Sequence, residues 1–288
     1  MRNTIYGAHL FVPANNVGFI TNIPLVKINN IIIDLEYATN FTEKKAARFL
    51  CKNSIPFIRK LCPKINITVR INIPSLIEIC REDLKIVLQA EPDSIRVPSV
   101  NTAKQLQNIV DLISLYSKEY SIQQVIKLHP MIETPEGVNN IDEIAKVSDR
   151  NQALCLGGED WVKNLGMKRT KTSEELNYIR SLVNLYATKN DLYAIDSVYP
   201  WLDDLDALEL DSINSKNMGF CARAIQNPRQ INIVNKVYYL TVEQKSYAQQ
   251  IIEQTKIIEL GESKMFLLND KIIDPLIYQR AQKDIENC

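Results

Sequence analysis

The sequence contains little glycine, and its cysteines are too scattered for several common kinds of site. Only 8 of the 288 residues are glycine, and no glycine-rich phosphate-binding loop occurs. The six cysteines include no Cys-x-x-Cys pair, which argues against a zinc site and against a disulfide framework. No serine or cysteine lies in a nucleophile-elbow pattern, which argues against covalent acyl catalysis.

Net charge and long hydrophobic runs are also missing. Lysine plus arginine and aspartate plus glutamate both total 34, so the chain has no electrostatic signature for nucleic acid or an anionic membrane. No apolar run approaches the roughly 18–20 residues of a membrane span. Residues 1–6 lack the apolar centre of a signal peptide. We therefore expect a cytoplasmic globular protein without nucleic-acid or membrane partners.

Short β-branched runs alternate with helical patterns along most of the chain. Continuous apolar runs that end at turn residues are typical of parallel strands buried on both faces. The predicted strands lie at 9–12, 30–35, 65–71, 93–97, within 127–137, within 153–161, at 192–195 and at 219–225. The predicted helices lie at 42–51, 76–90, 102–116, 141–146, 173–187 and 203–217, with Thr42 and Ser173 as expected N-caps.

Eight such strands alternating with helices predict an α/β protein with a (β/α)8 TIM barrel. An open doubly wound sheet is the alternative, disfavoured because no glycine-rich turn follows the first strand. The tail differs: it has a helical pattern at 242–257, a break at Gly261, a short apolar run at 264–268 and a helix from Pro275. We predict a barrel over residues 1–238 and a C-terminal lid or oligomerisation arm over 239–288.

The most informative stretch is 125–161, where two predicted strands end at acids. Glu133 follows the first strand, and Glu159 and Asp160 follow the second. The carboxyl ends of parallel strands meet at the same end of a barrel. One or two carboxylates with water and substrate oxygens suit Mg²⁺. The alternative is that these acids are ordinary polar loop residues.

Other predicted strand ends also carry charged or polar groups, namely Asp34, Glu36, Arg70, Asn72 and Asp196. An arginine there can bind a carboxylate through two hydrogen bonds, or stabilise an enolate as its charge develops. Acids, a divalent cation and an arginine together suit chemistry next to a carbonyl group, including carbon–carbon bond cleavage.

The two histidines, His9 and His129, lie within apolar strands. We predict structural roles for both of them rather than a role as general base.

Several short motifs occur together in a fixed order. They are Leu10-Phe11-Val12-Pro13, Ile33-Asp34-Leu35-Glu36, Val69-Arg70-Ile71-Asn72, Ile132-Glu133-Thr134-Pro135-Glu136-Gly137, Gly158-Glu159-Asp160, Ala194-Ile195-Asp196-Ser197-Val198-Tyr199, Gly219-Phe220, Pro228 and Gln230. In this order and spacing, which cover nearly the whole chain, the sequence resembles the citrate lyase beta-subunit family, whose relatives include malyl-CoA and citramalyl-CoA lyases.

The resemblance implies a (β/α)8 barrel that forms a homotrimer, binds Mg²⁺ and can associate with other lyase subunits. By motif position, Glu133 and Asp160 would be the metal ligands. Arg70 would contact the keto-acid part of the substrate, with Asp34 and Gly158 in the same binding set. Glu36 would act beside them, behind the ligands or on a water next to the metal.

Asp274 is the third residue of the expected catalytic set, with Arg70 and Glu36. Residues 268–275 resemble the lid segment of the family, and Asp274 falls where some members carry an acid/base that reaches a neighbouring subunit. The alternative is an N-cap ahead of Pro275.

The chain also departs from the family pattern, which makes it a divergent member. The departures are Tyr37 for an aspartate, Ala14 and Asn16 for a glycine and an arginine, Ser99 for a lysine, and Arg223 and Asn227 for a lysine and a histidine. Several of these positions lie on the thioester side of the pocket in relatives. We therefore expect an intact metal site and an altered acyl side.

The resulting hypothesis is a Mg²⁺-dependent carbon–carbon lyase, or the reverse condensing enzyme. Its substrate would be a citryl-, malyl- or citramalyl-like β-hydroxy acyl thioester, which yields a 2-keto acid and an acyl thioester through an enolate. Two alternatives remain at this stage: an aldolase acting on keto acids without CoA, and a non-catalytic barrel subunit that binds a keto acid or a metal.

Overall fold

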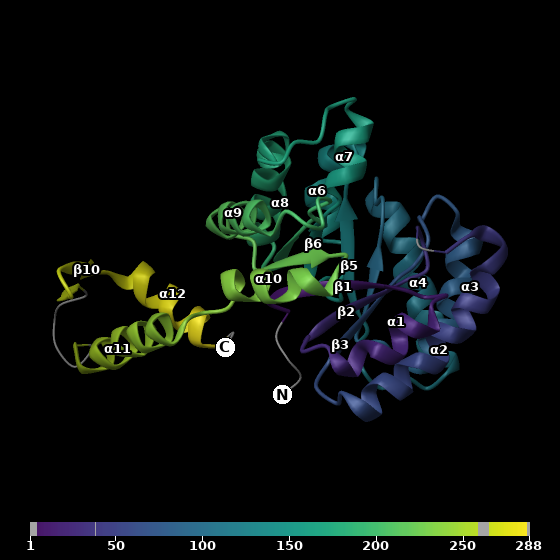
Figure 1. Ribbon diagram of the computed structural model, residues 1–288, viewed down its shortest axis with the longest axis horizontal. Helices are drawn as coiled ribbons and strands as arrows, with labels where there is room; N and C mark the ends of the chain where they lie inside the picture. Colours follow the sequence, from purple (N-terminus) through teal and green to yellow (C-terminus); the bar gives the residue numbers. More distant parts are fainter. Residues whose placement is uncertain (1–4, 38, 259–264, 287–288) are drawn as a thin grey trace.

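A closed barrel of eight parallel strands forms the centre of the protein (Figure 1). The computed structural model describes residues 5–37, 39–258 and 265–286. The strands, each hydrogen-bonded to the next, are β1 Gly7–Pro13, β2 Asn30–Asp34, β3 Asn66–Arg70, β4 Ser94–Val97, β5 Lys127–Ile132, β6 Ala153–Leu156, β7 Tyr193–Asp196 and β8 Ala222–Ile225. β8 pairs with β1 and closes the sheet. The predicted (β/α)8 barrel is confirmed.

Helices connect the strands and surround the barrel (Figure 1). They are α1 Val17–Asn22, α2 Lys44–Leu61, α3 Ile77–Val87, α4 Ala103–Glu119, α5 Pro135–Asn139, α6 Ile141–Ala145, α7 Gly158–Asn164, α8 Asn177–Lys189, α9 Leu205–Asn217 and α10 Ile231–Tyr238. Short 3₁₀ turns precede α2, α8 and α10 and follow α1 and α3. Among the described residues, no helix is both long and apolar enough to span a bilayer.

Burial on both faces explains why the strands read as continuous apolar runs. Every residue of β2 is buried, and Ile31 and Ile33 belong to the large cluster between barrel and helices. Register then fixes what lies at the strand ends. Asp34 at the end of β2 is paired with Arg70 at the end of β3, so that neighbouring strands present an acid and an arginine side by side.

The start of α4 has a complete cap, whereas the two predicted caps are wrong. Thr102 caps α4 and forms a capping box with Gln105. Thr42 lies inside the 3₁₀ turn Phe41–Glu43 and makes no cap. Ser173 adopts a left-handed conformation, and its hydroxyl accepts a hydrogen bond from Arg169 instead. Tertiary contacts at Ser173 therefore override its local capping preference.

A small arm follows the barrel and lies beside it (Figure 1). It consists of α11 Val242–Ile258, an antiparallel hairpin of β9 Phe266–Leu268 and β10 Lys271–Ile273, and α12 Pro275–Glu286. α11 and the start of α12 agree with the sequence prediction. The predicted break at Gly261 and the residue Lys264 fall outside the described residues.

The hairpin of the arm has one buried and one exposed apolar face. Leu268 and Ile273 belong to the arm's own core, while the cross-strand pair Leu267 and Ile272 is exposed. The two turn residues, Asn269 and Asp270, both have positive φ, as a tight hairpin requires. The sequence prediction missed β10 because it did not use this turn signal.

Candidate active site

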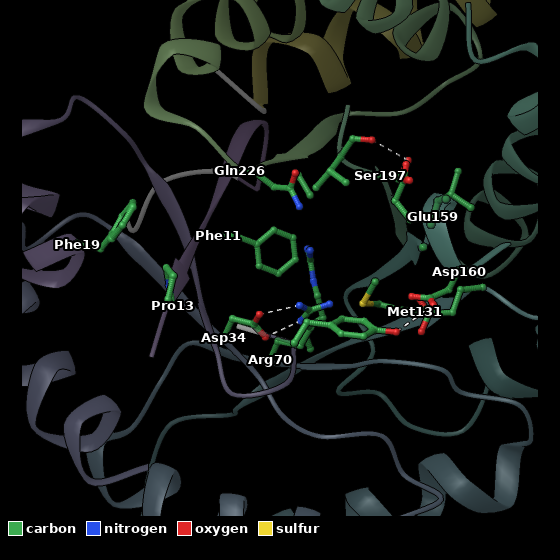
Figure 2. Close-up of a pocket in the computed structure, with 18 residues that line it drawn as sticks. Phe11, Pro13, Phe19, Asp34, Arg70, Met131, Glu159, Asp160, Ser197 and Gln226 are labelled. Atoms are coloured by element: carbon green, nitrogen blue, oxygen red, sulfur yellow. Dashed lines mark hydrogen bonds and ion pairs between the residues drawn. The ribbon is translucent and has the colours of Figure 1, made fainter. Parts of the chain in front are cut away.

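A cavity of about 420 Å³ opens at the carboxyl ends of the strands (Figure 2). Its charged lining residues are Asp34, Arg70, Arg96, Glu133, Glu159 and Asp160. Apolar side chains, among them Phe11 and Met131, fill the space between the charges. The cavity therefore occupies the face of a (β/α)8 barrel where catalytic groups are normally carried.

Glu133 lines this cavity and is held in place by Ser99 and Gly157. It follows β5, is buried, and accepts a hydrogen bond from the Ser99 amide at 2.6 Å. Gly157, after β6, packs against it so closely that a Cβ atom there would lie 1.8 Å from Glu133 Oε2. The carboxylate of Glu133 can occupy this position only because residue 157 has no side chain.

Asp160 approaches the same cavity from the first turn of α7. The Tyr37 hydroxyl donates a hydrogen bond to Asp160 Oδ1 at 2.9 Å. Figure 2 shows Asp160 on the side of the cavity away from Asp34. The neighbouring Glu159 is exposed and paired with Arg169 at 2.9 Å.

The two carboxylates influence one another. Burial raises the pKa of Glu133 to about 7, and the negative charge of Asp160 adds to the rise, against the lowering effect of Ser99 and Arg70. A divalent cation would relieve this repulsion, and two carboxylates with open positions suit Mg²⁺. Among the described residues, no group of three or more His, Cys, Asp or Glu is arranged as a metal cluster. The donor set thus fits a metal that takes most of its ligands from water and substrate.

Arg70 is fixed by two acids and two rings. Its Nε and Nη2 atoms donate to the two carboxylate oxygens of Asp34 at 2.7 Å each. Its Nη1 atom lies 2.9 Å from Glu36 Oε2 as an ion pair, although that contact lacks hydrogen-bond geometry. The Phe11 and Tyr37 rings lie 4.6 and 5.4 Å from its Cζ atom. Burial lowers the pKa of Arg70, but Asp34 and then Glu36 raise it above its ordinary value.

Glu36 does not line the cavity. Burial raises the pKa of its carboxyl to about 8, although Arg70 acts in the opposite direction. Gly158 does line the cavity, where a Cβ atom would lie 2.6 Å from Ser197 Oγ. The structure thus brings Asp34, Gly158 and Arg70 into the wall with the two metal-ligand candidates, and places Glu36 behind Arg70.

Asp274 lies on the arm, at the start of α12. Its Oδ1 atom accepts a hydrogen bond from the Ile277 amide at 2.8 Å, so that it caps the helix. It does not line the cavity of its own chain, and Figure 1 shows α12 beside the barrel. Within its own chain Asp274 is thus an N-cap. A catalytic role for Asp274 would require the cavity of another copy of the chain.

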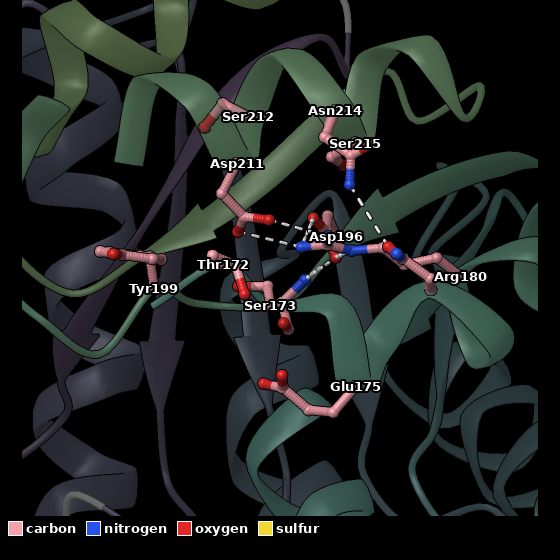
Figure 3. A network of polar contacts seen from close by, with 12 residues as sticks. Thr172, Ser173, Glu175, Arg180, Asp196, Tyr199, Asp211, Ser212, Asn214 and Ser215 are labelled. Atoms are coloured by element: carbon pink, nitrogen blue, oxygen red, sulfur yellow. Dashed lines mark hydrogen bonds and ion pairs between the residues drawn. The ribbon is translucent and has the colours of Figure 1, made fainter. Parts of the chain in front are cut away.

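Two further predicted strand-end groups are structural rather than part of the cavity. Asp196 is buried between Arg180 and Arg223, which also share Asp211. Figure 3 labels Arg180, Asp196 and Asp211 of this network. Arg180 Nη2 lies 2.9 Å from Asp196, and Arg223 Nη2 lies 2.7 Å from Asp211. Burial raises the pKa of Asp196, but the two arginines outweigh it and hold the pKa below its usual range. Arg223 therefore does not line the cavity.

The other strand-end group is Asn72. Its side chain and its amide both donate to Asp83 Oδ2, at 2.6 and 2.9 Å, and tie β3 to α3. The histidines are also buried inside the barrel, and burial lowers the pKa of both His9 and His129 to about 3. Neither histidine lines the cavity, which agrees with structural roles.

Sequence reasoning missed Arg96 and gave Tyr37 no positive role. Arg96 is in the middle of β4, where a strand-end search does not look. Alternation along the strand separates two faces, and the structure shows which is which: Ile95 and Val97 pack outward with the helices, and Ser94 and Arg96 face the interior. Tyr37 could not be connected to Asp160 from sequence, because 123 positions separate them.

Known proteins with similar sequences cover nearly the whole chain. The citrate lyase subunit beta of Leuconostoc mesenteroides subsp. cremoris is 30% identical over 276 residues, which is 95% of this chain and 90% of that protein. The mitochondrial citramalyl-CoA lyase of Rattus norvegicus is 29% identical over 286 residues, 96% of this chain and 83% of that protein.

Solved structures share the fold at lower identity. A citrate lyase from Burkholderia xenovorans LB400 superposes with a TM-score of 0.83 at 15% identity, covering 98% of this chain and 91% of that one. The protein CitE from Mycobacterium tuberculosis, in complex with magnesium, acetoacetate and coenzyme A, gives a TM-score of 0.75 at 21% identity, covering 100% and 99%.

The family profile described as HpcH/HpaI aldolase/citrate lyase matches residues 8–228, which include all eight barrel strands except the first residue of β1. The match therefore contains Arg70, Glu133 and Asp160 together with the strands that position them. The chain belongs to the HpcH/HpaI aldolase/citrate lyase family and is, by that membership, a carbon–carbon lyase.

Proposed function

We propose that this protein is a Mg²⁺-dependent lyase that cleaves a β-hydroxy acyl thioester into a 2-keto acid and an acyl thioester, or runs the reverse condensation. The observation that carries the proposal is the convergence of Glu133 and Asp160, from adjacent strands, on a cavity that also contains a rigidly held Arg70. The relatives named citrate lyase subunit beta and citramalyl-CoA lyase support the same reaction class.

Glu133 and Asp160 would hold the metal, which would supply Lewis-acid polarisation of a substrate oxygen. The hydrogen bond from Ser99 and the absence of a side chain at Gly157 keep Glu133 turned toward the cavity. The Tyr37 hydroxyl donates a hydrogen bond to Asp160 and keeps that carboxylate in place.

Arg70 would bind the carboxylate of the keto-acid half. Asp34 fixes its guanidinium plane through two hydrogen bonds, which leaves the remaining N–H groups to face the substrate. Glu36 would be a positioning residue, because it touches Arg70 and does not line the cavity. In the cleavage direction the hydroxyl proton goes to a base and the carbon–carbon bond breaks. The electron pair then remains on the thioester enolate, which is protonated in turn.

For the acid/base we propose Asp274 of a neighbouring copy in a homotrimer. Asp274 lies on the arm and outside its own cavity, and the exposed pair Leu267 and Ile272 on the same hairpin offers an apolar surface to another subunit. Association with other lyase subunits is a further proposal, suggested by the relatives named as citrate lyase subunits. The five described cysteines are all unpaired, which accords with a cytoplasmic location.

The reaction is tested with citryl-, malyl- and citramalyl-CoA in the presence of Mg²⁺, by following keto-acid release. We expect turnover with at least one thioester, and loss of at least about 100-fold in Glu133→Ala and Asp160→Ala. Mg²⁺-dependent binding of keto acids without turnover of any thioester would favour an aldolase acting without CoA. The observation that keeps this alternative open is Tyr37. It lies at the cavity where the family pattern has an aspartate, and it is about two-thirds exposed.

The role of Asp274 is tested by mixing two inactive variants. Glu133→Gln and Asp274→Asn are purified separately, mixed, and allowed to exchange subunits. If Asp274 acts on a neighbouring cavity, the mixture regains activity, because some cavities receive an intact Glu133 and an intact Asp274. Asp270→Asn, in the exposed hairpin turn of the same arm, is the control and should remain active. No recovery on mixing would exclude action between subunits.

A further inference from the structure

Arg96 is a cation of the cavity that makes no ion pair with an acid among the described residues. Arg96 is 1% exposed, and its Nε and Nη2 atoms have no hydrogen-bond partner among the described residues. No ion pair joins it to an acid in that part of the chain. A guanidinium keeps its proton in proteins, so Arg96 is a buried positive charge without an ion-pair partner among the described residues.

A second arginine, Arg70, lies beside Arg96. Arg96 and Arg70 are register partners on β4 and β3, so two arginines point into the barrel side by side. Burial lowers the pKa of Arg96, and the positive charge of Arg70 adds to the lowering, whereas Cys155 and Asp34 act in the opposite direction without outweighing burial. The Phe11 ring, labelled near the middle of the cavity in Figure 2, lies 4.6 Å from the Cζ atom of Arg70 and 5.9 Å from that of Arg96.

The acids of the cavity are already matched to other groups. Asp34 makes two hydrogen bonds to Arg70, and Glu36 lies beside the same guanidinium. Glu133 and Asp160 together suit one divalent cation. Once these partners are assigned, Arg96 is the cation that remains for a ligand.

We propose that Arg96 is a specificity-determining residue that binds a second carboxylate on the keto-acid half of the substrate. The inference rests on the proposed function, in which the first carboxylate is held beside Arg70. Neighbouring strands lie about 4.8 Å apart, which is close to the spacing between the two carboxylates of a four-carbon diacid. The cavity therefore selects substrates that release a dicarboxylic 2-keto acid over substrates that release a monocarboxylic one.

A structural role for Arg96 leads to different expectations. An arginine that stabilises the fold is paired, as Arg180 and Arg223 are, each with two acids. Removal of such an arginine destabilises the protein. Removal of an unpaired buried charge instead stabilises the ligand-free protein, and the cost appears in ligand binding.

The test compares two ligands of similar size. Calorimetry in saturating Mg²⁺ measures the affinity of wild type, Arg96→Met and Arg96→Lys for freshly prepared oxaloacetate and for 2-oxobutanoate, which lacks the second carboxylate. We expect Arg96→Met to bind oxaloacetate roughly 10- to 100-fold more weakly and to bind 2-oxobutanoate within about twofold of wild type. Arg96→Lys should recover part of the lost affinity, because it keeps the charge but not the planar donor geometry.

Thermal unfolding without ligand gives an independent readout. We expect the Tm of Arg96→Met to rise by a few degrees. An equal loss of affinity for both keto acids, or a lower Tm with an unchanged ratio of affinities, would overturn the proposal.

Failure of the proposed function is recognised separately. Glu133→Gln should abolish the Mg²⁺-dependent binding of both keto acids, and a wild type that binds neither refutes the metal-dependent reaction. Arg96 is then tested without metal: succinate should raise the Tm of wild type and leave that of Arg96→Met unchanged. Equal shifts in the two proteins would refute the assignment of Arg96.

Discussion

Adding one methyl group at Gly157 is expected to disable the metal site without changing either ligand. In Gly157→Ala the new Cβ atom would lie 1.8 Å from Glu133 Oε2 and 2.5 Å from Glu133 Cβ, whereas ordinary contacts begin at 3.4 Å. Rotation of the Glu133 side chain can move the oxygen, but it cannot move the Cβ atom. The backbones of β5 and β6 must therefore separate by about 0.9 Å at this point.

That separation also strains the hydrogen bond from the Gly157 amide to the Ile132 carbonyl, now 3.1 Å long. Overpacking of this kind costs about 1–3 kcal/mol of folding free energy. A displacement of about 1 Å at a ligand lowers metal affinity by roughly 10- to 100-fold. The backbone conformation of Gly157, with φ −101° and ψ 80°, adds no left-handed strain, so the whole effect comes from the contact.

The assay is calorimetric titration with Mg²⁺, together with urea unfolding of the same protein. The control is Gly18→Ala in α1, where the nearest atom that a Cβ would meet is Asn16 Oδ1 at 3.3 Å. We expect Gly18→Ala to bind Mg²⁺ like wild type. The reasoning is refuted if Gly157→Ala also binds Mg²⁺ with wild-type affinity and unfolds within about 0.5 kcal/mol of wild type.

Three further substitutions test other parts of the structure. Tyr37→Phe removes the hydrogen bond to Asp160 but keeps the ring, so Mg²⁺ affinity in the same titration should fall roughly 10-fold; unchanged affinity would show that the hydroxyl does not position the ligand. The pKa of Glu36, about 8, lies above its ordinary 4.5, so its contribution to stability is fully present below about pH 4.5 and is lost as pH rises to 8. Urea unfolding without Mg²⁺ should therefore show wild type losing up to about 1.4 kcal/mol per pH unit from this group, and Glu36→Gln should lose less; identical pH profiles would contradict the assigned pKa. Leu267→Lys places a charge on the exposed face of the hairpin beside Ile272 and should dissociate the proposed homotrimer in analytical ultracentrifugation; an unchanged mass would refute the proposal that this face contacts another subunit.

The strands could be predicted because burial on both faces leaves a local trace, as the isoleucines of β2 show. The proximity of Glu133 and Asp160 could also be predicted, because the carboxyl ends of parallel barrel strands lie at the same end of the barrel. Local pattern could not separate them from Asp196, which also ends a strand. Asp196 is neutralised by Arg180 and Arg223, and those contacts form only after the chain has folded.

Arg96 shows a second limit of sequence reasoning. Both faces of a barrel strand are buried, so alternation along β4 separates two faces but does not say which one lines a cavity. The turn at Asn269 and Asp270, in contrast, carried a usable local signal. The hairpin of the arm was therefore predictable in a way that the buried arginine was not.

The four-charge network of Arg180, Asp196, Asp211 and Arg223 limits how this chain can change its sequence. Loss of one member leaves a buried charge unpaired and costs about 3–5 kcal/mol, a large part of the 5–15 kcal/mol that typically keeps a protein folded. Replacement of all four by well-packed apolar side chains can be close to neutral. A protein with only one of the four residues replaced is therefore unstable, whereas one with all four replaced can be stable. These four positions have to change together. A substitution at the exposed Tyr37, in contrast, leaves no buried charge unpaired, so its cost falls on ligand positioning at the cavity and not on folding.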